Sequence, residues 1–99
     1  MKIGYTYIMT NKRRTVLYVG CTIDIIRRVK QHKSHYYKNS FTARYNCEYC
    51  VYYETLPDLK SAIQRENRLK NMRRSEKLAL INARNPKWKE LVNEHGICE

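Results

Sequence analysis

Five side chains in this sequence have types and spacings that suit chemistry on a phosphate ester. Tyr7 and Tyr18 are phenols, each within a short run of strand-like residues. Arg28 and His32 follow one helical turn apart, so they share a helix face. Glu66 falls on an apolar helical stripe, where a carboxylate is costly unless it is paired or binds a metal. Phenols can transfer protons, a guanidinium can neutralise phosphate, and one carboxylate can hold Mg²⁺ or Mn²⁺ with water and phosphate oxygens.

Each of these groups also has a purely structural interpretation. The two phenols could be cross-strand neighbours that only pack. The arginine and the histidine could be solvated helix residues. Glu66 could pair with Arg65 or Arg68 of its own helix, or with Arg28. Only the combination, on elements that a small sheet can bring together, favours a catalytic site.

Three strands are predicted to position these groups. Residues 2–9 and 15–21 are apolar on both faces, which indicates a sheet covered on both sides. The polar residues 10–14 between them predict an antiparallel hairpin. A third strand is expected over residues 51–56, ended by Pro57.

Four helices are predicted around the strands. Thr22 is expected to cap the first, which runs to about Ser34, and residues 34–47 are expected to form a loop. Asp58 is expected to cap the second. The inward face of that second helix should consist of Leu59, Ala62, Ile63, Glu66 and Leu69. Two further helices should begin at Ser75 and at Asn85-Pro86.

Size and charge favour one domain, residues 1–99, with a polyanionic partner. The chain has 20 Lys and Arg against 9 Asp and Glu, for a net charge of +11. This balance points to nucleic acid first and to an anionic membrane surface second. No apolar run approaches ~18 residues, and the N-terminus lacks a signal-peptide pattern, so a cytoplasmic protein with reduced cysteines and no membrane role is expected.

The motifs in order resemble the GIY-YIG nuclease superfamily, most closely its small single-domain bacterial members. Tyr5-Thr6-Tyr7 stands at the first motif and Tyr18-Val19-Gly20 at the second. Arg28, His32 and Glu66 then follow at matching places, and the resemblance extends over nearly the whole chain. The sequence departs from the family pattern at Tyr5, which occupies the Gly position of the first motif. The late asparagine of the family would be Asn85 or, less directly, Asn67.

The resemblance implies an α+β fold with a small three-stranded antiparallel sheet flanked by helices. It also implies an endonuclease that hydrolyses phosphodiester bonds by a water nucleophile with one divalent ion, Mg²⁺ or Mn²⁺. Glu66 would hold the ion, Arg28 would neutralise the transition state, Tyr18 or Tyr7 would take or relay a proton, and His32 would assist. DNA is favoured over RNA, in a setting such as DNA repair, with a separate protein partner available to select the target.

Basic and aromatic residues on the first two helices and in the loop are expected to bind the nucleic acid. The set is Arg27, Lys30, Lys33, Lys38, Arg44, Tyr45, Arg65, Arg68 and Arg73. The main alternative is a nucleic-acid-binding module that has the same fold and does no chemistry. A structural protein that docks on an acidic partner is a third interpretation, which leaves the tyrosines without a role.

The four cysteines add little to these interpretations. Cys47 and Cys50 have C-x-x-C spacing, but a zinc ribbon needs a second pair, and a redox motif should open a helix rather than a strand. Cys21 is expected to be a small buried apolar residue.

Overall fold

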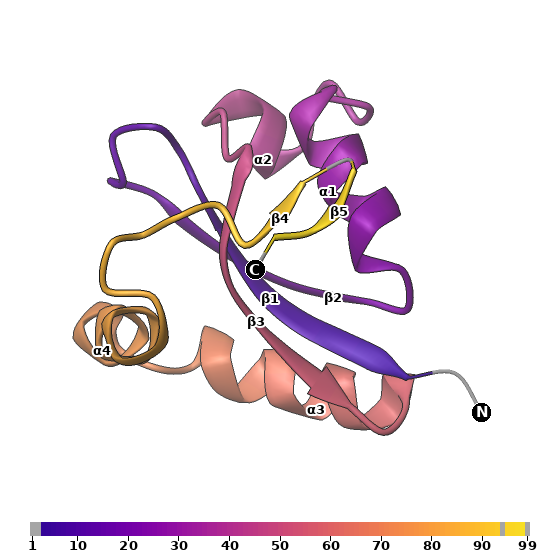
Figure 1. Ribbon diagram of the computed structural model, residues 1–99, viewed down its shortest axis with the longest axis vertical. Coiled ribbons are helices and arrows are strands. Elements are labelled where there is room, and N and C mark those ends of the chain that lie inside the picture. The colour runs from indigo at the N-terminus through magenta and orange to yellow at the C-terminus, as the bar shows by residue number, and fades with distance from the viewer. Residues whose placement is uncertain (1–2, 94, 99) are drawn as a thin grey trace.

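The computed structural model describes residues 3–93 and 95–98, and its elements are shown in Figure 1. Its strands are β1 (Gly4–Thr10), β2 (Leu17–Thr22), β3 (Tyr49–Leu56), β4 (Val92–Asn93) and β5 (Gly96–Ile97). Its helices are α1 (Ile25–Lys33), α2 (Phe41–Arg44), α3 (Leu59–Lys70) and α4 (Arg74–Arg84). The expected α+β class is confirmed. In these described ranges, no helix has the length and apolar character needed to cross a membrane.

The strands form one antiparallel sheet in the order β2-β1-β3-β4-β5. The sheet thus has five strands within the described residues, where the sequence predicted three. The two additional strands have two residues each, and β4 joins β3 through the pair Cys50 and Val92. Such short strands carry no alternating pattern, so they left no signal in the sequence.

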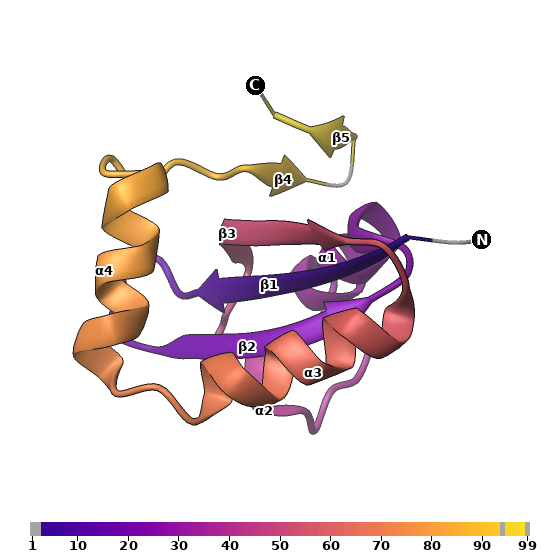
Figure 2. The same cartoon turned by 90° about the horizontal axis from the view of Figure 1, so that it is seen from below.

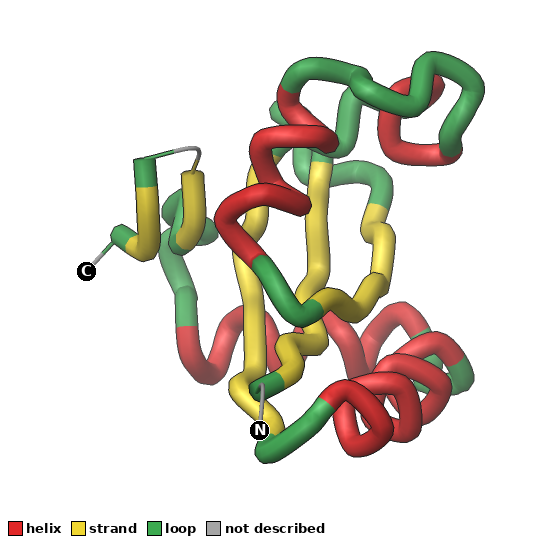
Figure 3. The backbone as a smooth tube through the Cα atoms, turned by 90° about the vertical axis from the view of Figure 1, so that its right-hand side faces the viewer, coloured by secondary structure: helices red, strands yellow, loops and turns green. Residues whose placement is uncertain are grey.

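Helices cover both faces of the sheet, as the strand pattern predicted. The core on the α1 side contains Tyr7, Met9, Ile25, Val29 and Val92. The core on the α3 and α4 side contains Ile8, Val19, Val51, Leu69 and Ile81. Figure 2 shows α3 running along the sheet on the face opposite α1, and in Figure 3 α1 crosses in front of the strands. Residues that alternate along β1 and β2 therefore point to different helices.

The first helix begins later than predicted. Asp24, and not Thr22, is the N-cap, because its Oδ1 accepts the backbone N–H of Arg27 at 3.1 Å. Thr22 is the last residue of β2, and its Oγ1 accepts the N–H of Asp24 at 3.1 Å. The loop predicted over residues 34–47 contains the short helix α2, which is capped by Ser40 through the N–H of Ala43 at 3.2 Å.

The second large helix, α3, is capped by Asp58 as predicted, with Oδ1 accepting the N–H of Ser61 at 2.7 Å. Its inward face is narrower than expected. Ala62 and Leu69 are buried, whereas Leu59 and Ile63 are 40% and 43% exposed. The apolar stripe therefore extends past the edge of the contact with the sheet.

The prediction of a helix that begins at Asn85-Pro86 is wrong. Asn85 ends α4, and its side chain is buried. Its Nδ2 donates to the carbonyl oxygens of Val51 at 3.0 Å and Lys89 at 2.8 Å, and its Oδ1 accepts the N–H of Lys89 at 3.0 Å. These bonds fold residues 85–89 into a turn that leads to β4. The preceding helix begins at Arg74, one residue before the predicted Ser75.

Candidate active site

The centre of the candidate site is a hydrogen bond between Tyr7 and His32. Tyr7 lies on β1 and is 1% exposed, and its hydroxyl is 2.9 Å from Nε2 of His32 on α1. Gly20 on β2 pairs with Tyr7, and a Cβ at position 20 would lie 2.5 Å from the Tyr7 oxygen. The glycine of the Tyr18-Val19-Gly20 motif therefore leaves the space that the phenol occupies.

The burial of both groups fixes the direction of this hydrogen bond. Burial, followed by the charge of Arg28, lowers the pKa of His32 from 6.5 to about 4, so the ring is neutral at pH 7. Burial raises the pKa of Tyr7 well above its usual range, so this phenol keeps its proton. Tyr7 therefore donates to Nε2 of His32, and the ring proton must sit on Nδ1.

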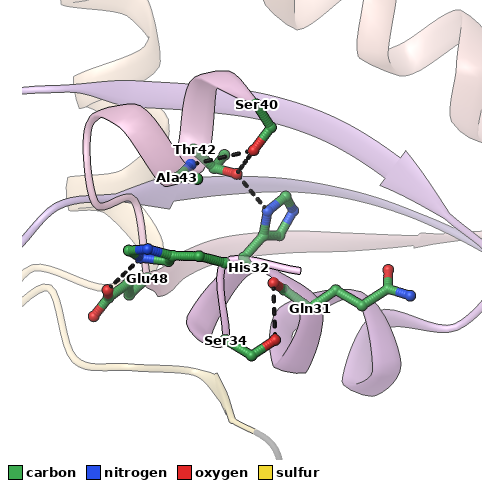
Figure 4. A network of polar contacts seen from close by, with 8 residues as sticks. Gln31, His32, Ser34, Ser40, Thr42, Ala43 and Glu48 are labelled. Atoms are coloured by element: carbon green, nitrogen blue, oxygen red, sulfur yellow. Dashed lines mark hydrogen bonds and ion pairs between the residues drawn. The ribbon is translucent and has the colours of Figure 1, made fainter. Parts of the chain in front are cut away.

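The Nδ1 proton of His32 meets a polar chain from α2 (Figure 4). Thr42 is 3% exposed, and its Oγ1 lies 2.8 Å from Nδ1. Oγ1 is in turn 3.2 Å from Oγ of Ser40, the N-cap of α2. The sequence did not identify Ser40 and Thr42 as part of the site, although a serine that can accept the N–H three residues later is a typical N-cap.

Tyr18 lies against the same histidine from β2. Its ring is edge-on to the His32 ring at 5.6 Å between centroids, and it stacks on Phe41 of α2 at 5.9 Å. A cavity of about 360 Å³ opens beside these rings, and its walls include Tyr18, Arg28 and His32. Tyr18 is thus the phenol that reaches open space, while Tyr7 lies behind it in the core.

Arg28 carries the positive charge of this cavity. It is half-buried on α1, and its Nη1 is 3.4 Å from Oε1 of Gln31. Its buried Nε has no hydrogen-bond partner among the described residues. Arg28 also lines a wider polar hollow of about 610 Å³ with Thr22 and Asp24. Because Arg28 lines both open spaces, its guanidinium is placed to receive an anion from solvent.

Glu66 approaches from the other face of the sheet, on α3. Its side chain is 16% exposed, and Oε1 accepts the thiol of Cys21 at 3.5 Å. Oε2 is 3.3 Å from Nζ of Lys70, whose side chain is 51% exposed. The ion-pair partner is therefore Lys70, whereas the sequence suggested Arg65, Arg68 or Arg28.

Cys21 is the residue of β2 that contacts Glu66. It lies on the edge strand β2 directly after Gly20 and is half-buried, so its expected role as a simple buried apolar residue is wrong. Burial and then the carboxylate of Glu66 raise the pKa of its thiol, while Lys70 and Arg28 act in the opposite direction. Glu66 and Arg28 are therefore both close enough to act on one thiol at the sheet edge.

The structure thus brings Tyr7, Tyr18, Arg28 and His32 together and places Glu66 at the adjoining edge. Neither asparagine considered for the late family position joins them in the described contacts. Asn85 is used by the turn after α4, and Asn67 is exposed on α3.

Most of the residues expected to bind nucleic acid have exposed side chains. Those exposed are Arg27, Lys30, Lys38, Arg44, Tyr45, Arg68 and Arg73. Two are held by carboxylates instead. Lys33 pairs with Glu90, and Arg65 binds both oxygens of Glu54 at 2.8 and 2.9 Å.

Comparison with known proteins agrees with the geometry. The model of the GIY-YIG catalytic domain matches residues 3–79. A UPF0213 protein of Syntrophus aciditrophicus (strain SB) is 35% identical over 81 residues, covering 82% of this chain and 92% of that protein. The solution NMR structure of a UPF0213 protein from Bacillus halodurans has a TM-score of 0.55 and 24% identity, covering 89% of this chain and 92% of its own, which is a likeness of fold alone. The chain therefore belongs to the GIY-YIG family, whose catalytic domains are typically nucleases that bind nucleic acid and use divalent metal ions.

Proposed function

We propose that this protein is an endonuclease that hydrolyses phosphodiester bonds in nucleic acid, with DNA favoured, using a water nucleophile and one divalent ion. Residues 1–99 would form one nuclease domain. The observation that carries the proposal is the cavity lined by Tyr18, Arg28 and His32, with Glu66 at the adjoining edge strand β2. A module that only binds nucleic acid has no need of a largely buried carboxylate beside the phosphate path.

Glu66 is the residue that would hold the ion. Within the described residues, no three His, Cys, Asp or Glu side chains form a metal-ligand group. A single carboxylate nevertheless fits Mg²⁺ or Mn²⁺, because hard ions at phosphate-binding sites keep several waters and take phosphate oxygens as ligands. A bound ion would supply Lewis-acid stabilisation of charge on the phosphate oxygens. Lys70 is exposed, so its ammonium can leave Glu66 at little cost.

Arg28 would bind the scissile phosphate. Its guanidinium is paired with no carboxylate among the described residues, and its planar fork matches the oxygens of a phosphate. As charge grows on these oxygens in the transition state, the guanidinium would stabilise it without reorganisation.

The two phenols would have different tasks. Tyr18 lines the cavity and would take or relay the proton of the attacking water. Tyr7 is buried and protonated, so it would position His32, whose neutral ring packs against Tyr18.

The substrate would approach over the exposed basic and aromatic residues of α1, α2 and the loop between them. Tyr36, Tyr37, Phe41 and Tyr45 are between 44% and 65% exposed, and Arg27 and Lys30 lie beside them on α1. Each phosphate that a cation neutralises adds about −0.9 to the log–log salt slope on duplex DNA. Exposed rings can stack on unpaired bases.

One observation favours the alternative of a binding module without catalysis. The contact between Lys70 and Glu66 neutralises the carboxylate, and a permanent pair would leave no site for an ion. The discriminating measurement is nicking of supercoiled plasmid and branched DNA with Mg²⁺ or Mn²⁺ and with EDTA. An endonuclease nicks only with the ion, whereas the binding module retains the DNA and never nicks it.

Two variants make this experiment specific. Arg28→Ala and Glu66→Ala should each lower nicking by at least about a hundredfold, a typical loss when one transition-state contact is removed. Binding of the same DNA in EDTA should persist in Glu66→Ala. Lys60→Gln, on the exposed first turn of α3, is the matched control and should nick as the wild type does. Nicking that survives Glu66→Ala would point to a contaminating nuclease and would remove the proposal.

A further inference from the structure

A second basic surface lies at the end of the sheet where β1 turns into β2. Three segments that are distant in sequence meet there: the turn at residues 11–16, the start of α4 and the turn after α4. Figure 2 shows α4 and the segment after it at this end of the sheet. We call this region the hairpin-end surface, and its basic residues are Lys12, Arg13, Arg14, Arg73, Arg74, Lys87 and Lys89.

Two arginines join the three segments. Nη2 of Arg14 donates to the carbonyl oxygen of Lys87 at 3.2 Å, and its guanidinium lies 5.9 Å from the centre of the Trp88 ring. Nη2 of Arg74 donates to the carbonyl oxygen of Thr15 at 2.9 Å. Neither arginine is neutralised by a carboxylate in these contacts, because both bind main-chain oxygens. These main-chain contacts hold the two guanidinium groups in place and leave their positive charges unneutralised.

The other cations of this surface are free. All seven of its basic residues are exposed, and the side chains of Lys12, Arg13, Lys87 and Lys89 have no hydrogen-bond or ion-pair partner among the described residues. Neither of the two acidic residues nearby forms an ion pair with these cations in the described contacts. Glu76 accepts the N–H of Arg73 at 3.0 Å, and Glu90 is paired with Lys33. Such a concentration of unpaired positive charge costs self-repulsion and is relieved by an anionic partner.

The surface is hollowed and lies near the candidate active site. A cavity of about 300 Å³ has Lys12, Arg14 and Trp88 among its walls, together with Glu90, whose carboxylate is paired with Lys33. Tyr18 is four positions after Arg14 in the sequence, so their Cα atoms are at most ~14 Å apart. This is roughly four nucleotide steps along one strand of B-DNA. A nucleic acid whose scissile phosphate lies at Arg28 could therefore extend onto this surface.

We propose that the hairpin-end surface is a second phosphate-binding surface, which holds the nucleic-acid backbone a few nucleotides from the scissile bond. This inference rests on the proposed function for the identity of the ligand as a nucleic acid. It concerns binding alone and needs no cleavage. It assigns a role to Lys12, Arg13, Lys87 and Lys89, none of which belongs to the cluster around His32. The recognition is of backbone charge and not of base sequence.

The test is equilibrium binding of a short fluorescein-labelled DNA duplex in EDTA, measured by anisotropy over a series of KCl concentrations. Lys12→Gln, Arg13→Gln and Lys87→Gln should each lower the salt slope by about 0.9 and the affinity by about fivefold near physiological salt. The double variant Lys12→Gln/Lys87→Gln should lose about twice the slope of either single variant.

Lys60→Gln is the matched control, since it removes one exposed charge at the start of α3. The start of α3 lies beside Gly4 through Asp58 and Ala62, at the opposite end of β1 from the turn. Lys60→Gln should bind with an unchanged salt slope. Equal losses in Lys60→Gln and Lys12→Gln, or unchanged slopes in all the hairpin-end variants, would overturn the inference. Duplex binding that follows this pattern in a protein that never nicks DNA would remove the proposed endonuclease activity and leave the second surface standing.

Discussion

The oxygen of Tyr7 lies 2.5 Å from the point that a Cβ of residue 20 would occupy, so Gly20 and Tyr7 share one small space. The two residues pair across β1 and β2. The same point is 3.1 Å from Cε2 of Tyr18, so a side chain at position 20 would disturb both phenols. The glycine and the two tyrosines of the motifs are therefore one packing unit around His32.

We expect Gly20→Ala to displace the phenol of Tyr7 and to lower the free energy of unfolding by about 1–3 kcal/mol, the usual cost of overpacking. Urea unfolding followed by circular dichroism measures this loss. Combining the change with Tyr7→Phe gives a double-mutant cycle. Because both variants act on the same hydrogen bond, their costs should not add. Strict additivity, or an unchanged urea midpoint in Gly20→Ala, would show that the space is not shared.

The second prediction concerns Thr42, which accepts the Nδ1 proton of His32 at 2.8 Å. Thr42→Val keeps the shape and removes the acceptor, leaving a buried N–H without a partner at a cost of about 1–3 kcal/mol. Thr42→Ser retains the hydroxyl, so it should lower the free energy of unfolding much less than Thr42→Val does.

The nitrogen-15 chemical shifts of the His32 ring give a readout that is specific for this role. The wild type and Thr42→Ser should show a protonated Nδ1 and an unprotonated Nε2, whereas Thr42→Val should show exchange between tautomers. This measurement does not depend on nuclease activity. An Nε2–H tautomer in the wild type would reverse the direction of the whole chain from Tyr7 to Ser40.

The third prediction is a pH dependence that originates at His32. Its pKa in the folded protein is about 4, below the ordinary 6.5, so between these values the unfolded chain binds a proton that the folded protein does not. The stability that the neutral ring contributes is fully present above pH 6.5 and is lost as the pH falls towards 4. The gap corresponds to up to ~3 kcal/mol.

Urea unfolding at pH 7 and pH 5 should therefore show a larger loss of stability in the wild type than in His32→Gln. Lys60→Gln, which leaves all three histidines in place, is the control and should keep the wild-type dependence. If His32→Gln does not fold, NMR titration of the wild-type ring replaces it. A His32 ring that titrates near pH 6.5 would contradict the burial argument.

The strands β1, β2 and β3 and the helix α3 could be predicted from sequence because they depend on local periodicity and capping, and the order of the motifs predicted the grouping of four site residues. Asp58 caps α3 as predicted. The end of the chain could not be predicted in the same way. Asn followed by Pro suits a helix start, but the amide of Asn85 binds the carbonyl oxygen of Val51, 34 positions earlier in the sequence, and holds a turn. A contact over that separation leaves no mark in a local pattern.

The residues that hold the site residues in place could not be predicted from the sequence either. Ser40 and Thr42 matter because α2 packs beside His32, and Cys21 matters because Glu66 of α3 accepts its thiol. Spacing along the chain predicted which residues could do chemistry. It did not predict which neighbours hold them, because these neighbours come from other elements and are set by tertiary packing.

The last prediction concerns Lys70, whose ammonium lies 3.3 Å from Oε2 of Glu66 and competes with a divalent ion. Lys70→Gln should tighten Mn²⁺ binding about twofold, since an exposed ion pair one helical turn apart contributes about 0.3–0.5 kcal/mol. Electron paramagnetic resonance of free Mn²⁺ measures the affinity without any substrate. Glu66→Gln should abolish this binding, and Lys60→Gln should not change it. Because Lys70→Gln frees the Glu66 carboxylate and Glu66→Gln removes it, the affinity for Mn²⁺ must decrease in the order Lys70→Gln, wild type, Glu66→Gln. An affinity unaffected by Glu66→Gln would place the ion elsewhere and remove the role proposed for this carboxylate.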